Sequence, residues 1–242
     1  MRHDADVLVF NSLASTNEHA REIAPKLDKT TIIAALEQTG AKGTKGRSFY
    51  CGNGEGLYFS VALGPVPDLR RANLVTPAAG VAVATMLCDL CGVDARIKWV
   101  NDVVIDDKKI CGILSESRFK DSVLEYLIVG IGINLNVKSF PEEIADKATS
   151  LDRHNPDFDP NEMCAKITDS LLDMIYDDRE LKFMSEYKRL SSVLRRYVDF
   201  ESGGTKLTGI ASDINKNGNL VVVVGDRNYI INAGDVSITL IN

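Results

Sequence analysis

The chain has 242 residues, of which 45% are hydrophobic and 26% charged, and its 28 basic and 34 acidic residues give a net charge of −6. This composition excludes disordered and fibrous proteins, and the length permits one large domain or one medium domain with a small companion. The acidic balance also disfavours bulk nucleic acid as the main partner, because a surface that binds nucleic acid is basic.

The ends and the cysteines of the chain predict a cytoplasmic protein. Residues 1–6 include two acids and precede only four strongly apolar residues, which is not the pattern of a signal peptide. The longest apolar stretch, residues 74–88, is shorter than the roughly 20 residues that a membrane helix needs. The five cysteines have no disulfide spacing and the three histidines have no ligand spacing, so we expect reduced thiols and no metal site formed by histidine.

The first half of the chain alternates between strand and helix signals. Ser15 is a typical N-cap, and Pro25 ends the helix that follows it. A second helix begins near Pro77 and stops at Gly92, and a loop rich in glycine spans residues 38–56. Strands are predicted at residues 7–10, 30–36, 57–63, 95–100, 103–105, 109–115 and 124–133.

The second half of the chain predicts helices that cover the sheet, followed by a small β domain. Residues 162–176 and 181–190 have helical periodicity. From residue 197 onward short strands alternate with turns, at residues 205–214, 220–224, 229–231 and 236–240. We therefore predict an α+β fold, with a mixed β-sheet domain flanked by helices over residues 1–192 and a small C-terminal SH3-like β-barrel over residues 193–242.

Residues 40–48 form the most informative loop. Its glycines let successive backbone N–H groups turn towards one anion, and Lys42, Lys45 and Arg47 add positive charge. The loop matches neither a Walker A motif nor a dinucleotide fingerprint. It is therefore either a cradle for phosphate or carboxylate, or a solvated turn.

Two further segments are candidates. Lys98 alternates with Ile97 and Trp99 on a predicted strand, and a lysine on an inward face needs an anion. An exposed strand lysine is the plainer interpretation. Residues 130–136 combine two glycines with two asparagines at a strand end, which suits a ligand or a simple turn.

Five motifs in order resemble the biotin protein ligase family over nearly the whole chain. They are Ser-Thr-Asn at 15–17, Glu-Gln-Thr at 37–39 leading into 42–47, Lys-Trp-Val-Asn-Asp at 98–102, residues 109–114 with Glu116, and Gly-Ile-Gly-Ile-Asn at 130–134. The resemblance implies a carbon–nitrogen ligase of the biotin–[acetyl-CoA-carboxylase] type. ATP and Mg²⁺ would activate biotin to biotinyl-5′-AMP, and a lysine of a biotin carboxyl carrier domain would then receive it.

The resemblance also implies a role for individual residues. Lys98 would be the principal catalytic residue, between the biotin carboxylate and the α-phosphate, with Arg47 on phosphate. Mg²⁺ would arrive with ATP rather than at a fixed protein site. Biotin would be bound by Ser15, Thr16, Asn17, Gln38, Lys42, Gly43, Thr44, Lys98 and Gly112, and ATP by Lys42, Arg47, Trp99, Asn101, Lys109 and Asn134.

Some positions depart from the family pattern. Lys42 and Thr44 stand where arginines are usual, so a bidentate fork and one charge are lost, and we expect a weaker hold on the adenylate. Phe49 replaces a tryptophan and Val100 a proline. Because the first motif already appears at Ser15, we expect no N-terminal DNA-binding domain and no DNA partner. A homodimer is possible.

Two other functions remain open. Lipoate ligases share this chemistry, but here Arg70 and Arg71 are not followed by the glycine run that is typical of them. A non-catalytic sensor of biotin or nucleotide is compatible with the altered loop, although Lys98 and Asn101 argue against it. A third alternative, an interaction domain, leaves the five ordered motifs unexplained.

Overall fold

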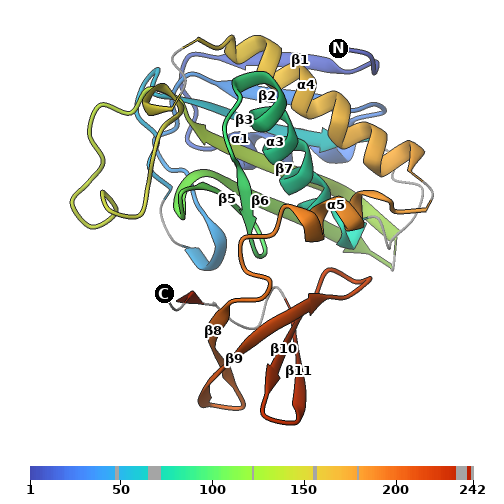
Figure 1. Cartoon of the computed structure of the whole chain (residues 1–242). Coiled ribbons are helices and arrows are strands. Elements are labelled where there is room, and N and C mark those ends of the chain that lie inside the picture. The colour runs from blue at the N-terminus through green and yellow to red at the C-terminus, as the bar shows by residue number, and fades with distance from the viewer. Residues whose placement is uncertain are drawn as a thin grey trace.

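The computed structural model describes residues 1–46, 49–64, 72–121, 123–154, 157–178, 180–232 and 239–240. A seven-stranded mixed sheet has the order β1-β2-β3-β7-β6-β5-β4, and a five-stranded antiparallel sheet has the order β11-β10-β9-β8-β12 (Figure 1). The strands of the large sheet are β1 (Asp6–Phe10), β2 (Thr31–Ala35), β3 (Gly56–Leu63), β4 (Arg96–Lys98), β5 (Asp102–Ile105), β6 (Lys108–Lys120) and β7 (Val123–Asn134).

Helices cover both faces of the large sheet. Helix α1 (Thr16–Ile23) packs on one face through a small apolar cluster that includes Ala20, Ile33 and Ile128. Helices α3 (Val75–Cys91), α4 (Pro160–Leu172) and α5 (Phe183–Arg189) lie on the other face, over the main core (Figure 1). Helix α3 is apolar all round because the sheet, α4 and α5 all contact it.

Local signals determine where these helices begin and end. The Ser15 hydroxyl accepts a hydrogen bond from the Glu18 backbone N–H at 3.4 Å, as the N-cap of α1. Gly92 ends α3 with a left-handed φ of 67°, a conformation that costs glycine no steric energy. Both boundaries agree with the sequence prediction.

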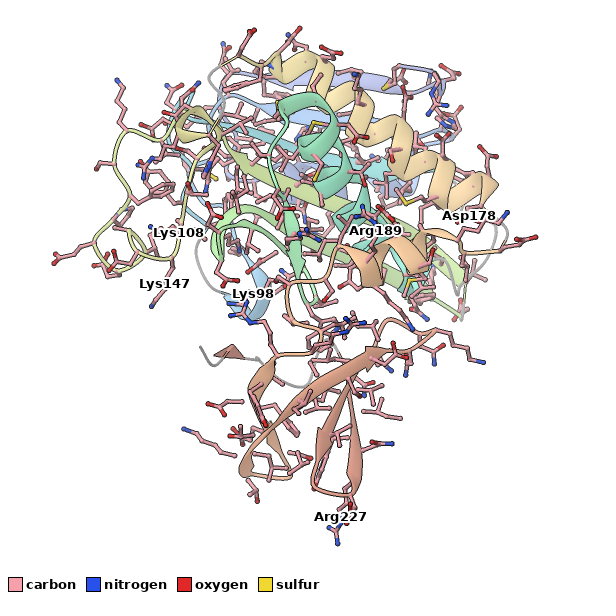
Figure 2. All side chains as sticks on the ribbon, viewed as in Figure 1. Lys98, Lys108, Lys147, Asp178, Arg189 and Arg227 are labelled. Carbon is pink, nitrogen blue, oxygen red and sulfur yellow. The ribbon has the colours of Figure 1, made fainter. Side chains whose placement is uncertain are left out.

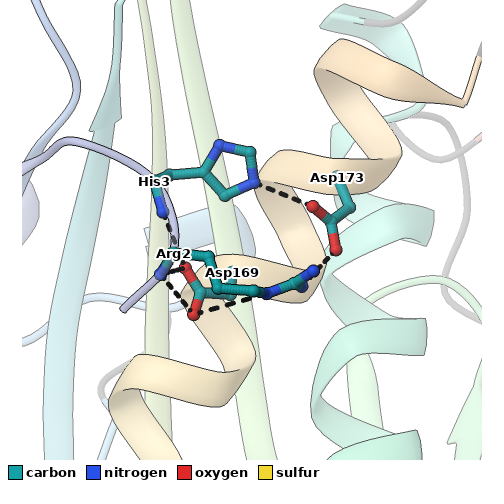
Figure 3. A network of polar contacts seen from close by, with 4 residues as sticks. All are labelled: Arg2, His3, Asp169 and Asp173. Atoms are coloured by element: carbon teal, nitrogen blue, oxygen red, sulfur yellow. Dashed lines mark hydrogen bonds and ion pairs between the residues drawn. The ribbon is translucent and has the colours of Figure 1, made fainter.

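The N-terminal residues are fastened to α4 (Figure 3). The backbone N–H groups of Arg2 and His3 donate to the Asp169 carboxylate, and the His3 ring lies 2.8 Å from an Asp173 oxygen. The Arg2 guanidinium pairs with the other oxygen of Asp173. Burial alone would raise the pKa of Asp173, but the hydrogen bonds from His3 and Arg2 lower it below its ordinary value. His3 thus pairs with an acid, in a cluster with Asp173 and Asp177.

The C-terminal sheet follows the last helix. Its strands are β8 (Tyr197–Ser202), β9 (Thr205–Ile214), β10 (Leu220–Val224), β11 (Arg227–Ile231) and β12 (Thr239–Leu240). Alternate residues such as Val198, Phe200 and Val222 are buried, which is the pattern of a sheet with one covered face. Within the described ranges no pairing joins β11 to β12, so closure into a barrel stays a prediction.

Some predicted boundaries were wrong. Strand β4 ends at Lys98, because Trp99 begins the turn to β5. Strands β6 and β7 run further than predicted, as a hairpin whose exposed polar residues conceal the strand signal. Strand β8 was not anticipated as a separate strand. The predicted helix 162–176 begins two residues earlier and turns into a π-helix at Asp173–Asp177.

No helix among the described residues is long and apolar enough to cross a membrane. The five cysteines are thiols. Burial raises the pKa of the Cys164 thiol to about 11, and it likewise raises the pKa of Cys111.

Candidate functional site

The N-terminus of α1 and Gln38 form a polar cluster on one face of the large sheet. The Gln38 Oε1 atom accepts hydrogen bonds from the Thr16 backbone N–H at 2.8 Å and from the Thr16 hydroxyl at 3.2 Å. The Ser60 hydroxyl on β3 lies 2.7 Å from the Thr16 hydroxyl and 2.6 Å from Asn17 Oδ1. Ser15, Thr16 and Asn17 are all buried, so these groups are already in place for a polar ligand.

Asn17 lies over a row of three paired residues: Ser60 on β3, Gly130 on β7 and Leu114 on β6. Its amide donates to the Leu114 carbonyl at 3.2 Å and to the Glu116 carboxylate at 2.8 Å. A Cβ atom at Gly130 would lie only 2.2 Å from Asn17 Oδ1. Gly130 therefore makes room for Asn17.

A second row crosses the sheet two residues further along. In register, Tyr58 pairs with Gly132, Gly132 with Gly112, Gly112 with Asp102, and Asp102 with Lys98. Directly paired residues point to the same face, so Lys98 shares the face that carries the polar cluster. The two glycines leave a strip without side chains between Tyr58 and Asp102.

The ring of Phe49 covers this glycine strip. Cβ atoms at Gly112 and Gly132 would lie 2.9 Å and 2.7 Å from the ring. The Lys109 ammonium lies 5.5 Å from the ring centroid, within cation–π range. In the sequence Phe49 stands out only as a replacement for tryptophan, because nothing local shows that a loop aromatic packs on glycines from two distant strands.

Lys98 stands at the end of this row, at the turn between β4 and β5. Asp102, its direct neighbour, pairs with Lys109 Nζ at 2.6 Å. Among the described residues no acid lies within ion-pair distance of Lys98, which is partly exposed. Asn101 is fixed beside it by a 2.9 Å hydrogen bond from its amide to the Ile113 carbonyl. Figure 2 shows Lys98 below the large sheet, on the side of the C-terminal sheet.

The glycine loop lies next to α1. Lys42 is exposed and its ammonium lies 3.1 Å from Glu18 on α1. Gly43 and Thr44 are partly buried, and residues Thr44–Gly46 form a short 3-10 helix. Arg47 lies outside the described residues.

Two further residues have specific places. Asn134 is 4% exposed and donates to the Thr149 carbonyl at 3.0 Å, so its amide fastens a loop, and nucleotide contact stays a prediction. Cys51 accepts a hydrogen bond from the Gln38 amide at 3.4 Å, and burial raises the pKa of its thiol to about 12.

Comparison with known proteins gives the family. The model of the biotin/lipoate A/B protein ligase family matches residues 9–134, more than half of the chain. The chain belongs to this family. The matched segment contains all the predicted site residues, from Ser15 to Asn134.

Individual relatives are also similar. The biotin–[acetyl-CoA-carboxylase] ligase of Mycobacterium tuberculosis is 30% identical over 85% of this chain and 77% of its own length. The bifunctional ligase/repressor BirA of Bacillus subtilis is 35% identical over 60% of this chain but 46% of its own length, so the chain spans less than half of that relative. Among solved structures, the biotin protein ligase of Aquifex aeolicus in complex with biotin and ATP has a TM-score of 0.81 and 27% identity, covering 97% of this chain and 99% of that one.

One site residue was not revealed by the motifs: Ser60, which bridges Thr16 and Asn17. Gly130 and Gly132, which shape the floor of the site, belong to the fifth motif. Ser60 sits in an ordinary apolar strand, so only pairing between distant strands reveals it.

Proposed function

We propose that this protein is an ATP-dependent biotin protein ligase. The main support for the proposal is the arrangement of one face of the large sheet. The polar cluster lies at one end of this face, the glycine strip of Gly112 and Gly132 lies in the middle, and Lys98 lies at the other end. Three inter-strand steps of about 4.8 Å separate β7 from β4, or about 14 Å. A bicyclic ring in the cluster and a valerate chain along the strip, in the place that the Phe49 ring covers in this structure, would direct the biotin carboxylate towards the lysine side chain.

The reaction has two steps. The biotin carboxylate attacks the α-phosphorus of ATP, a new C–O–P linkage forms, and pyrophosphate leaves. The amine of a carrier lysine then attacks the acyl carbon of biotinyl-5′-AMP, an amide forms, and AMP leaves with the electron pair of the broken bond. Lys98 would hold the carboxylate and the α-phosphate together and stabilise the charge that builds up on the phosphorus oxygens. Asn101 and Lys109 would face the nucleotide. The Trp99 ring is buried and its indole donates to the Gly218 carbonyl, so a contact between Trp99 and the nucleotide stays a prediction.

The donor set fits Mg²⁺ brought by ATP. In the described part of the site, Asp102 supplies the carboxylate of the row that ends at Lys98. Lys109 already pairs with this carboxylate, so the protein itself offers few free oxygen ligands there. A magnesium ion prefers several oxygen ligands, which the polyphosphate and water supply. Bound in this way, Mg²⁺ would neutralise charge on the departing pyrophosphate.

The polar cluster favours biotin over lipoate. Thr16, Asn17, Gln38 and Ser60 present hydroxyls and amides that match the donors and acceptors of a ureido ring. A dithiolane ring has no N–H or C=O group to bond with them, so lipoate would lack about 0.5 to 1.5 kcal/mol for each hydrogen bond that a ureido ring could make there. Pyrophosphate release with biotin, compared with lipoate, tests this proposal, and equal rates for both acids would overturn it.

We also propose that the two domains have separate roles. Residues 1–192 would carry both chemical steps, and residues 193–242 would form a separate C-terminal unit. The acceptor would be the biotin carboxyl carrier domain of a carboxylase.

The edges of the large sheet support a proposal for the homodimer. Strand β4 is already bonded to residues 190–192, whereas β1 has no second neighbour among the described strands. Val7 and Val9 on β1 are 53% and 69% exposed, so we assign a dimer contact to β1. Light scattering of Val9→Lys tests it, since a charge there would prevent dimerisation.

A further inference from the structure

Contacts from distant parts of the chain hold the segment that carries Lys98 and Asn101. Strand β4 has three residues and lies at the edge of the sheet. Residues that follow α5 cover this edge: the Ile97 N–H donates to the Leu190 carbonyl at 2.8 Å, and the Ser192 N–H donates to the Ile97 carbonyl at 2.9 Å. So short a strand needs such additional contacts to keep one position.

Tyr187 on α5 supplies the first of two side-chain contacts. Its side chain is fully buried, and its hydroxyl donates to the Val100 carbonyl at 3.0 Å. Val100 lies in the turn between Lys98 and Asn101, so this hydrogen bond fixes the turn from the helical side of the sheet.

Trp99 supplies the second contact. Its indole N–H donates to the Gly218 carbonyl at 2.9 Å, and the ring is 6% exposed. Gly218 lies in the connection between β9 and β10, where the C-terminal sheet faces the large domain (Figure 1). A Cβ on Gly218 would lie 3.4 Å from Pro77, so this turn also sits against the start of α3.

Asn215 determines which way the Gly218 carbonyl points. Its Oδ1 atom accepts hydrogen bonds from the backbone N–H groups of Asn217 at 2.9 Å and Asn219 at 3.1 Å. The Gly218 N–H donates to the Asn215 carbonyl, and Gly218 has a φ of +80°. The side chain of Asn215 thus braces the turn that receives the Trp99 indole.

We propose that Tyr187 and Asn215 are positioning residues for Lys98 and Asn101. Neither lies on the polar face of the site, and each acts through the backbone or ring of the intervening residues. The inference rests on the proposed function, and it gives the C-terminal sheet a defined part in the first chemical step. A reacting group displaced by about 1 Å loses much of its rate, so losing either brace would lower catalysis without emptying the biotin pocket.

The first test compares two tyrosines. Tyr187→Phe deletes only the hydroxyl that reaches Val100, whereas Tyr176→Phe deletes a hydroxyl that donates to the Gly64 carbonyl at 3.3 Å, away from the site. The net free energy of one hydrogen bond, about 1 kcal/mol, corresponds to a factor of about five to ten in a rate constant. We expect kcat/KM for ATP to fall about fivefold to tenfold in Tyr187→Phe and to stay near wild type in Tyr176→Phe, with the KM for biotin within about twofold in both.

The second test compares two substitutions at one position. Asn215→Ala removes the acceptor in the turn, and Asn215→Asp keeps it. We expect kcat/KM for ATP to fall about fivefold in Asn215→Ala and to recover in Asn215→Asp. A general loss of stability would not discriminate between ATP and biotin in this way.

A third readout does not depend on the reaction. Trp99 is the single tryptophan of the chain, so its fluorescence reports on this segment alone. We expect acrylamide to quench it more strongly in Tyr187→Phe and Asn215→Ala than in the wild type, Tyr176→Phe or Asn215→Asp. Unchanged quenching together with unchanged ATP kinetics would overturn the inference. If the wild type releases no pyrophosphate, the proposed function fails, and the quenching alone decides whether Tyr187 and Asn215 position the segment.

Discussion

Replacement of Gly130 by alanine tests the polar cluster at a single point. The added methyl would lie 2.2 Å from Asn17 Oδ1 and 2.9 Å from Asn17 Cγ, closer than atoms can approach. Gly130 lies inside β7 and its φ is not positive, so the backbone itself accepts alanine. The side chain of Asn17 must therefore move.

The cost follows from what Asn17 would give up. Its side chain accepts one hydrogen bond from Ser60 and donates one each to the Leu114 carbonyl and the Glu116 carboxylate. At about 1 kcal/mol for each neutral bond and roughly 2 kcal/mol for the one to Glu116, the gross loss is about 4 kcal/mol. This loss falls on the stability of the fold. A displaced Asn17 also forgoes one or two hydrogen bonds to biotin, about 1.4 to 2.8 kcal/mol, and we expect biotin to bind about 10-fold to 100-fold more weakly.

Calorimetric titration with biotin in the absence of ATP measures this directly. Gly80→Ala is the control, because its Cβ would meet its nearest neighbour, Ile97, at an ordinary 3.5 Å. Alanine inside helix α3 should leave the biotin affinity unchanged and the fold at least as stable. A biotin affinity in Gly130→Ala within twofold of the wild type would refute the placement of Asn17 in the pocket.

Three further outcomes are expected. Thr44→Arg restores a guanidinium to the loop, and stopped flow should show slower release of biotinyl-5′-AMP; an unchanged off-rate would contradict a role for this position in retention. Desolvation raises the pKa of the Cys51 thiol to about 12, so mass spectrometry should find it alkylated slowly in the native protein and quickly in urea; fast native labelling would contradict the raised pKa. The pKa of Asp173 is lowered, so its carboxylate stabilises the fold fully above pH 3.8 and loses this contribution as the pH falls through the lowered pKa. The difference in Tm between the wild type and Asp173→Asn should therefore be large near pH 6 and shrink below pH 3.8. A difference independent of pH would refute the pairing with Arg2 and His3.

Local chemistry made much of the fold predictable. Ser15 has the hydroxyl that caps a helix, Gly92 has the freedom to end one, and residues 31–35 are apolar enough for a strand covered on both faces. Such signals depend on neighbours in sequence. The short β4 and the long β6–β7 hairpin were misjudged because turn and strand propensities overlap at Trp99 and in the polar residues after Ser115.

The site was predictable only in part, for a related reason. The motifs marked Thr16, Gln38 and Lys98, and the structure brings Thr16 and Gln38 into contact and sets Lys98 on the same face. Ser60, however, enters the site because β3 pairs with β7, far along the chain. Tyr187 reaches Val100 from a helix 87 residues away. Pairing between distant strands leaves no local signal, so these residues emerge only from the structure.

The central claim is biotin transfer that depends on Lys98. The most direct measurement is the intact mass of an apo biotin carrier domain after incubation with this protein, ATP, Mg²⁺ and an equal mixture of biotin and lipoate, beside a Lys98→Ala variant shown to be folded. We predict a single biotin adduct with the wild type and none with the variant. A lipoyl adduct, equal transfer by the variant, or no adduct with the wild type would contradict the claim.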